Sequence, residues 1–439
     1  MRRFLKQWLG GSLLPPARPA ATVTSPQAGE LTLDALRVTP GEALSAARLP
    51  TVAIIILNYN GRHHLDGCFT SLALLDYPKD KLEVILIDNG SDDGSQQEMR
   101  ERHRWVRTIE NQRNVGFTGG CNQGAAAAKD AELLVFLNND MRVEPRWLAE
   151  LVAPIVRKEC QATSAKMFSW DGKLINSAGG GMNFHGIGIQ TGYMETPGPE
   201  HDVPRKTLFA CGGAMAIEKR VFHEVGAFDP EFFAYYEDVD LGWRLWILGH
   251  SIHYVPSAVC YHHHSSTSRT FPPETIRVLQ VRNPLYACFK NYDDEHLRKI
   301  LPAMLALATR RMLLISGIPS DRPFRIEDVD LDRPGAIGKL LDKAKRSFDP
   351  EMTLRRNAGA DLIAINDLLG NWDHWMERRA LVQNARRRSD SEIFALFMKP
   401  LWCVEEEGAY RSLHSGLAKF LGIDAMFQGL SIDGRDPHR

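Results

Sequence analysis

Three groups of acidic and amide side chains stand directly after apolar or aromatic stretches of this sequence. Asp88 follows the run EVILI, Asp140 ends the triplet that follows LLVFL, and Asp238 follows the stretch FFAYYE. Carboxylates can hold a divalent cation, take a proton from a hydroxyl group or accept a hydrogen bond from a nucleobase. Because ligands of open α/β sheets bind where the strands end, we expect all three groups to line one crevice. The pattern favours chemistry on a nucleotide over a purely structural role.

The first two carboxylates suit recognition of a nucleotide. Asp88 can accept the imide N–H of a base, whereas the residues from Ser91 to Asp93 suit a turn and the N-cap of the next helix. Asp140 suits a Mg²⁺ or Mn²⁺ ion held mainly by a nucleotide diphosphate, since such ions prefer carboxylate oxygens and keep positions open for phosphate. The competing interpretation of Asn138-Asn139-Asp140 is an ordinary polar turn.

The third carboxylate group opens a helix. Glu237 and Asp238 follow the aromatic residues of the segment 232–236, which suits a platform for an acceptor sugar with a general base beside it. Acidic residues at a helix start are also stabilised by the helix dipole alone, and Asp240 with Arg244 has the spacing of an ordinary helix pair. The functional interpretation therefore rests on Glu237 and Asp238.

Other nucleotide and metal signatures are absent or weak. The turn Asn58-Tyr59-Asn60-Gly61 contains neither GxGxxG nor GxxxxGK[ST]. The glycines between 116 and 124 also suit a tight turn into a helix, so they are weak evidence by themselves. Of the consecutive His262, His263 and His264, at most one or two can face one ion on an extended chain. A zinc site that adds Cys260 and His253 has no supporting ligand spacing.

Composition narrows the class of protein. The chain has 439 residues with 53 Lys and Arg against 54 Asp and Glu, so no global field favours nucleic acid or an anionic membrane. Its seven cysteines are scattered without a CxxC pair, which argues against a disulfide framework and fits a reducing cytoplasm. The first twenty residues lack a signal-peptide core. Residues 301–317 are split by Arg310-Arg311, which suits a packed amphipathic helix, or a membrane-surface helix, but not a membrane span.

The order of apolar and polar segments predicts an α/β fold. Residues 1–49 are rich in Ala, Pro and Thr and are expected to form a flexible leader. Strand signals at 52–57, 83–87, 106–110 and 133–137 alternate with helix signals, which predicts βαβ units and a mostly parallel sheet. The glycine- and proline-rich residues 170–206 predict a loop or hairpin excursion. The chain beyond 273 has a helical pattern, and we expect domain boundaries at 49/50 and 292/293.

Taken together and in this order, the motifs closely resemble those of the family 2 glycosyltransferases of the GT-A fold, in particular the rhamnosyltransferase-like branch. The resemblance covers residues 51–292, including Arg282-Asn283 and Lys290-Asn291-Tyr292. It implies a GT-A, Rossmann-like and mostly parallel mixed sheet flanked by helices, with residues 50–292 as the glycosyltransferase domain and 293–439 as an α-helical C-terminal extension.

The resemblance also implies a role for each motif. The metal ligands it implies are Asp140, in the place of a DXD motif, and His262, and the catalytic base is Asp238 beside Glu237. Because Asn138 stands where a true DXD motif has its first acid, only one metal carboxylate remains, and metal affinity without nucleotide should be weak. The nucleotide-binding residues implied are Asn58, Tyr59, Asn60, Asp88, Asn114, Gly116, Asn122 and Asn139.

The function implied is an inverting, metal-dependent and non-processive transfer of a sugar from a nucleotide-diphosphate donor to a hydroxyl group. The donor would be dTDP-rhamnose or a UDP-sugar, the cofactor Mg²⁺ or Mn²⁺, and the acceptor a glycan or lipid-linked oligosaccharide of surface polysaccharide synthesis. Such an enzyme would act in the cytoplasm, with peripheral contact at the inner face of the membrane as an option, and would bind no nucleic acid.

Processive relatives carry a QxxRW motif, whereas Arg104-Trp105 here follows Glu101 and precedes the metal motif. Two alternatives belong to other classes of protein. A catalytically silent carbohydrate- or nucleotide-binding relative would lack the base or the metal ligand. A nucleotidyltransferase would carry a glycine- and lysine-rich signature after the first strand.

Overall fold

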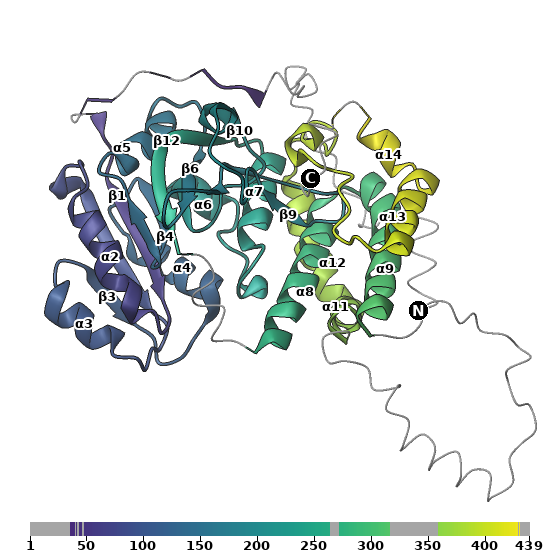
Figure 1. Cartoon of the computed structure of the whole chain (residues 1–439), viewed down its shortest axis with the longest axis horizontal. Coiled ribbons are helices and arrows are strands. Elements are labelled where there is room, and N and C mark those ends of the chain that lie inside the picture. Colours follow the sequence, from purple (N-terminus) through teal and green to yellow (C-terminus); the bar gives the residue numbers. More distant parts are fainter. Residues whose placement is uncertain are drawn as a thin grey trace, which may run out of the picture.

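A mixed β-sheet forms the centre of the computed structural model, and helices cover both of its faces (Figure 1). The structure describes residues 36–39, 41, 44–45, 48–263, 272–316, 359–428 and 430. Within these residues, ten strands join one sheet, in which the main path runs β10-β12-β6-β11-β4-β1-β2-β3. The expected α/β class is confirmed.

The half of the sheet around β1 is parallel, as the alternating pattern predicts. Residues 52–56 of β1 are all buried, because helices cover both faces and a strand in that position can be apolar throughout. The strands are β1 (Val52–Asn58), β2 (Leu82–Asp88), β3 (Arg107–Glu110) and β4 (Leu133–Asn138), and the helices between them are α2 (Arg62–Ala73), α3 (Ser95–Arg102) and α4 (Gly116–Ala127). Their register places Asn58 beside Asp88 at the carboxyl ends.

The other half of the sheet brings together residues far apart in the sequence. Strand β11 (Ala214–Glu218) runs antiparallel between β4 and β6 (Ala162–Ser169), and β12 (Ile252–His262) is parallel to β6. The short β5 (Met141–Val143) pairs with the end of β12, with Met141 opposite His262. This pairing sets Asp140, the residue before β5, near His262, the last residue of β12.

The expected excursion at 170–206 contains short strands and a hairpin. Strand β7 (Ile175–Ser177) pairs with β6, while β8 (Gly180–Met182) and β9 (Gly188–Gln190) form a separate two-stranded sheet. Strand β10 (Arg205–Lys206) then returns to the main sheet beside β12. Three helices complete this half: α5 (Trp147–Val156), α6 (Lys219–Glu224) and α7 (Glu237–Ile247).

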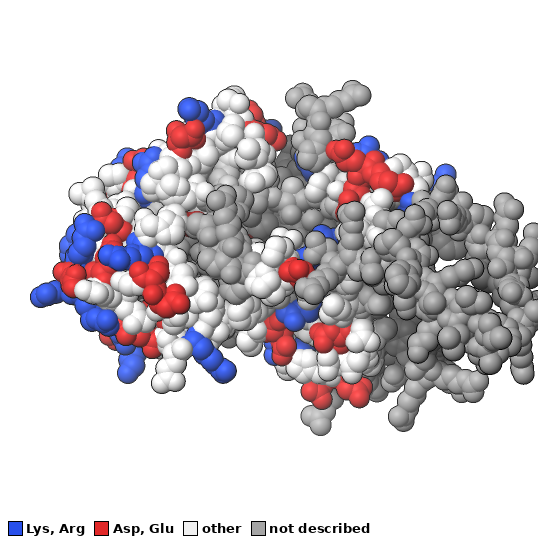
Figure 2. Space-filling model, turned by 60° about the horizontal axis from the view of Figure 1, so that its bottom comes forward, with Lys and Arg blue, Asp and Glu red and all other residues white. Residues whose placement is uncertain are grey.

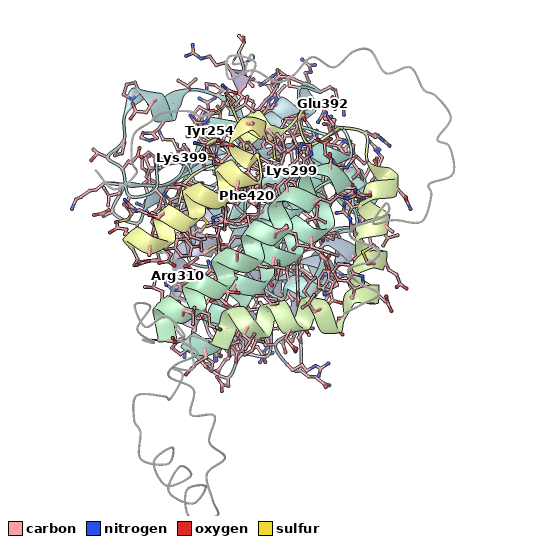
Figure 3. The ribbon with its side chains drawn as sticks, turned by 90° about the vertical axis from the view of Figure 1, so that its right-hand side faces the viewer. Tyr254, Lys299, Arg310, Glu392, Lys399 and Phe420 are labelled. Carbon is pink, nitrogen blue, oxygen red and sulfur yellow. The ribbon has the colours of Figure 1, made fainter. Side chains whose placement is uncertain are left out.

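The C-terminal helices gather at one end of the molecule, where α9 and α13 lie side by side (Figures 1 and 3). They are α8 (Pro273–Asn291), α9 (Asp294–Ser316), α11 (Gly359–Gly370), α12 (Trp372–Ala385), α13 (Gly408–Phe420) and α14 (Ile423–Met426). The helical extension is confirmed for the described residues. The apolar side chains of this extension pack in the same hydrophobic core as one face of the sheet, and this core contains both Ile55 of β1 and Phe427 after α14. The domain boundary expected at 292/293 therefore stays a prediction.

The described part of residues 301–317 is the second half of α9. Its Leu301, Met304 and Leu307 are buried, and Arg311 forms an ion pair with Asp361 of α11. This agrees with a packed amphipathic helix. None of the helices in the described ranges is long and apolar enough to span a membrane. On the face in Figure 2, basic and acidic side chains of the described residues are interspersed, as the balanced composition leads one to expect.

Most of the expected leader, and the tail after residue 430, lie outside the described residues. The described part of the leader touches the folded domain, because Leu36 and Leu49 are buried and the Val38 N–H donates to the Pro204 carbonyl over 3.1 Å. The backbone of Arg37 forms an isolated antiparallel β-bridge with that of Arg205 in β10. The flexible leader and its boundary at residue 49 stay predictions.

Candidate active site

A cavity of about 400 Å³ opens at the carboxyl ends of β1 and β4 and at the start of α7. Among its lining residues are Tyr59, Asn114, Gly116, Asn139, Asp140, Glu237, Asp238 and His262, all of which were singled out from the sequence. A larger hollow of about 780 Å³ lies around Leu133 and Lys219 and contains none of them. The expected convergence therefore holds for two of the three carboxylate groups, those of Asp140 and Asp238.

Asp140 and His262 form a pair that fits a divalent cation. The Oδ1 atom of Asp140 lies 3.2 Å from Nε2 of His262, and both side chains are largely buried. The other ring nitrogen of His262, Nδ1, lies 2.9 Å from Oδ1 of Asn176. When Nδ1 donates to Asn176, the lone pair of Nε2 faces a carboxylate oxygen, and two acceptors at that distance require a cation or a proton between them. Adjacent ligands of an octahedral Mg²⁺ lie about 3 Å apart, so the spacing suits two neighbouring coordination positions.

The remaining residues of the metal motif are amides. Asn138 lines the cavity, and Nδ2 of Asn139 donates to Oδ1 of Asn58 over 2.7 Å. Among the described residues, clusters of three metal-ligand side chains occur at Glu195, Glu200 and His201 and at Asp293, His296 and Asp390, and neither includes Asp140. Asp140 and His262 can thus supply two of the coordination positions around a cation, and donor phosphate or water would supply others. His264 lies outside the described residues, and His263 stacks on Trp170.

Asp88 is fully buried in a polar network at the end of β2 and does not line the cavity. Its two oxygens accept hydrogen bonds from Nδ2 of Asn58 at 2.9 Å, from the N–H and the hydroxyl of Ser91 at 2.9 and 2.7 Å, and from Nε2 of Gln96 at 2.9 Å. Asn60 has a φ of 51° and accepts from the Asp92 N–H. This arrangement holds the first turn in shape. Contact of Asp88, Asn58 or Asn60 with a nucleotide stays a prediction, and for Asp88 it would require one of these donors to move.

The N-cap residue of α3 is Gly94, one residue after the segment expected to supply it, and the Asp93 side chain nevertheless binds the start of this helix. Its carboxylate accepts from the N–H groups of Ser95, at the start of α3, and of Arg62, at the start of α2, over 3.0 and 2.8 Å. One side chain therefore ties two helix starts together.

The turn before α4 differs from the expectation at one residue. Oδ1 of Asn114 accepts from the Gly116 N–H over 2.8 Å, and Gly116 has a φ of 81°. A Cβ atom at Gly116 would lie 2.6 Å from the Phe233 ring, so only glycine fits this approach. The Asn122 side chain instead makes two hydrogen bonds with the backbone of Phe228, at 2.8 and 3.1 Å, and does not line the cavity. Asn122 thus tethers a neighbouring loop, and its nucleotide-binding role stays a prediction.

Asp238 is held rigidly at the start of α7. Its Oδ2 accepts from the Gly212 N–H over 3.0 Å, and its Oδ1 accepts from the Val239 N–H over 2.8 Å. Burial raises the pKa of Asp238, and these backbone N–H groups act in the opposite direction. A carboxylate that is fixed, faces a cavity and has a raised pKa has the properties of a general base.

Glu237 lies deeper than Asp238. Its side chain is buried, and its Oε2 has no hydrogen-bond partner among the described residues. Burial, and next the charge of Asp238, raise the pKa of Glu237 well above its ordinary value. The pKa is therefore raised at both carboxyl groups, and the larger rise is at Glu237.

The loop before α7 is strained. Phe233, Tyr235 and Tyr236 have φ values of 59°, 68° and 65°, which bulky side chains rarely adopt. Such conformations cost on the order of 1–3 kcal/mol each and persist where surrounding structure enforces them, most often at functional sites. All three side chains line the cavity, as does Phe117 of α4.

Comparisons with known proteins identify the family of this chain. The model of Glycosyl transferase family 2 matches residues 53–226. An N-acetylglucosaminyl-diphospho-decaprenol L-rhamnosyltransferase of Mycobacterium tuberculosis is 30% identical over 248 residues, which cover 50% of this chain and 78% of that protein. The chain belongs to glycosyl transferase family 2. The family expected from the motifs is thereby confirmed.

Other matches to this family 2 chain cover less of the similar protein. The O-antigen biosynthesis protein RfbC of Myxococcus xanthus is 30% identical over 208 residues, or 45% of this chain and 16% of RfbC. The hexosyltransferase Agl10 of Haloferax volcanii is 25% identical over 203 residues, or 45% of this chain and 62% of Agl10. A structure of GalNAc-T7 with UDP, GalNAc and Mn²⁺ covers 60% of this chain and 52% of that one, at 21% identity and a TM-score of 0.45.

Sequence reasoning missed part of the cavity wall of the family 2 chain. The missed residues are Gly188 and Gln190 of β9, Phe209 and Cys211 to Gly213 before β11, and Thr275, Ile276 and Leu279 of α8. Gly188 and Gln190 belong to the excursion, residues 209–213 come between β10 and β11, and the last three belong to α8. None of them carries a charged group. The paired glycines of Cys211-Gly212-Gly213 are the one sequence feature that could have pointed to this wall. In the structure, the Gly212 N–H donates a hydrogen bond to Asp238.

A prediction on stability follows for Glu237. Because the folded state holds this proton to a higher pH than the unfolded state, stability is lost as pH rises above the ordinary glutamate pKa of 4.5. Glu237→Gln cannot titrate and should therefore raise Tm at pH 7.5 by on the order of 2 °C, with the difference shrinking toward pH 4. Differential scanning calorimetry across this range measures it. Exposed Glu377→Gln serves as the control, and an equal difference at both pH values contradicts the prediction.

Proposed function

We propose that this chain is an inverting, metal-dependent and non-processive glycosyltransferase that moves a sugar from a nucleotide diphosphate to a hydroxyl group. One observation carries the proposal: the fixed carboxylate of Asp238 and the pair of Asp140 and His262 line the same cavity. A transferase of this kind needs a base for the acceptor and a stabiliser for the leaving diphosphate. The cavity supplies residues of both kinds.

In this proposal, the oxygen of the acceptor hydroxyl group attacks the anomeric carbon while Asp238 accepts the proton of that hydroxyl group. The Gly212 and Val239 N–H groups keep the carboxylate oriented during this step. Glu237, whose raised pKa favours its protonated form, limits the negative charge beside Asp238. The aromatic side chains of the loop 232–236 contact the sugar and exclude water. Asp140 and His262 would hold the Mg²⁺ or Mn²⁺ ion, which when bound neutralises charge on the diphosphate.

The finer assignments rest on similarity. We propose dTDP-rhamnose or a UDP-sugar as the donor and a glycan or lipid-linked oligosaccharide of surface polysaccharide synthesis as the acceptor. The similarity to proteins named L-rhamnosyltransferase and O-antigen biosynthesis protein supports these choices. A cytoplasmic location, with contact at the inner face of the membrane, and domain boundaries at 49/50 and 292/293 belong to the same proposal.

A thermal-shift screen tests the proposal first. UDP, dTDP and GDP are each titrated with and without Mn²⁺, since a ligand that binds the native state raises Tm with its occupancy. We expect one diphosphate to raise Tm, and Mn²⁺ to increase the shift. The matching nucleotide-sugar is then incubated with acceptors, mass spectrometry detects transfer, and NMR of the product shows whether the anomeric configuration is inverted. Binding without transfer points to a silent relative, and release of pyrophosphate from a nucleoside triphosphate points to a nucleotidyltransferase.

A further inference from the structure

Helix α8 runs alongside the segment 229–240, which contains the strained aromatic loop and both carboxylates of the proposed base site. Near the end of α8, Nζ of Lys290 lies 2.6 Å from Oδ2 of Asp229 and 2.8 Å from Oδ1 of Asp240. All three side chains are buried. The helix therefore contacts the segment just before the loop and again one turn after its end.

Asn283, two turns before Lys290 on α8, contacts the backbone of the loop 232–236. Asn283 is fully buried, and its Nδ2 lies 2.9 Å from the Phe232 carbonyl, 2.9 Å from the Ala234 carbonyl and 2.7 Å from the Tyr235 carbonyl. Its Oδ1 accepts from the neighbouring Arg282, so the amide orientation is set by partners on both sides. Two amide hydrogens serve three carbonyls, which only a closely folded loop can bring together.

The opposite side of the loop touches the donor turn. The Thr118 N–H of α4 donates to the Phe233 carbonyl over 3.2 Å, and the Phe233 ring occupies the space that a Cβ of Gly116 would need. The loop is thus held between α4 and α8. Backbone conformations with positive φ at Phe233, Tyr235 and Tyr236 relax unless such contacts enforce them.

We propose that Asn283 is a positioning residue, whose amide holds the loop 232–236 in the strained form that presents Asp238 to the acceptor. It touches neither substrate nor cofactor and acts through the loop. This inference rests on the proposed function for its effect on turnover, whereas its effect on the loop is independent of any reaction. It also gives the C-terminal helices a part in the chemistry, because α8 packs on α12 through Tyr286 and Trp375, with ring centroids 3.8 Å apart.

The test compares Asn283→Asp and Asn283→Ala with wild type by hydrogen exchange and by kinetics. Asn283→Asp keeps the shape but turns an oxygen toward three carbonyls, and Asn283→Ala removes the donor without adding charge. Asn183→Asp is the matched control, because Asn183 is also fully buried and donates to a carbonyl, that of Trp402, outside this loop. We expect faster exchange in peptides covering 231–238 for both Asn283 variants and unchanged exchange there for the control.

We also expect kcat to fall at least tenfold, while the nucleotide diphosphate Kd changes less than about threefold, since loop misplacement affects the base more than the donor site. Unchanged exchange in 231–238 overturns the positioning role, whatever the activity. Faster exchange with unchanged kcat overturns the link to chemistry. If wild type transfers no sugar from any donor, the proposed function fails, and the exchange result still decides whether Asn283 holds the loop.

Discussion

Replacing Asp238 by Asn should lower kcat by about 10²- to 10⁴-fold, which is the usual contribution of a positioned base. Asparagine keeps the shape of the side chain, and its oxygen can still accept one of the two backbone hydrogen bonds that now reach Asp238 from Gly212 and Val239. It cannot accept the proton of an acceptor hydroxyl. Because the hydrogen bonds of Asp238 come from Gly212 and Val239 and not from the predicted donor residues, nucleotide affinity should stay nearly unchanged. Initial rates at saturating donor, together with nucleotide titrations, measure both quantities.

Glu237→Gln is the matched variant for this experiment, because it changes the adjacent carboxyl group without removing the fixed one. It should reduce kcat less than Asp238→Asn does, since burial and the charge of Asp238 raise the pKa of Glu237 and so favour its protonated form, which cannot accept a proton. If Asp238→Asn retains most of its turnover and Glu237→Gln loses it, the base has been assigned one residue too late. If neither variant changes turnover, direct displacement with a base at this loop is wrong.

Replacing Asp140 by Ala should remove the Mn²⁺-dependent part of nucleotide affinity, a loss of roughly 10- to 100-fold. The physical reason is the composition of the motif: Asn138 and Asn139 are neutral, so Asp140 supplies its only carboxylate. After the change, His262 alone would remain of the proposed pair. Isothermal titration of the nucleotide diphosphate with and without Mn²⁺ measures the difference.

Exposed Asp80→Ala provides the control for overall charge, and it should bind nucleotide and metal as wild type does. Affinity without metal should be nearly the same in Asp140→Ala and wild type, because the other predicted nucleotide contacts are unchanged. An equal enhancement by Mn²⁺ in Asp140→Ala and wild type would remove Asp140 from the metal site. A loss of affinity that is equal with and without Mn²⁺ would show that the carboxylate shapes the cavity and binds no ion.

The sequence by itself determined the central strands and the residues at their ends. Continuous apolar runs such as residues 52–57 can be strands only where helices cover both faces, and the alternation with helix signals then fixes a parallel order. Since parallel strands end at one edge, Tyr59, Asn139 and Asp140 had to lie near one another. The family could be named for the same reason, because its motifs occupy these strand ends.

Only the tertiary structure decided what each polar side chain touches. The pairing of β5 with β12 sets His262 beside Asp140, and no local pattern encodes a contact between residues so distant in sequence. Aspartate and asparagine are residue types that often bind ligands, yet Asp88 and Asn122 form hydrogen bonds with other residues of the protein. The side chain of an asparagine or aspartate can form hydrogen bonds with a ligand or with the backbone of a loop. Packing alone determines which, because it sets whether another donor or acceptor fills the space first.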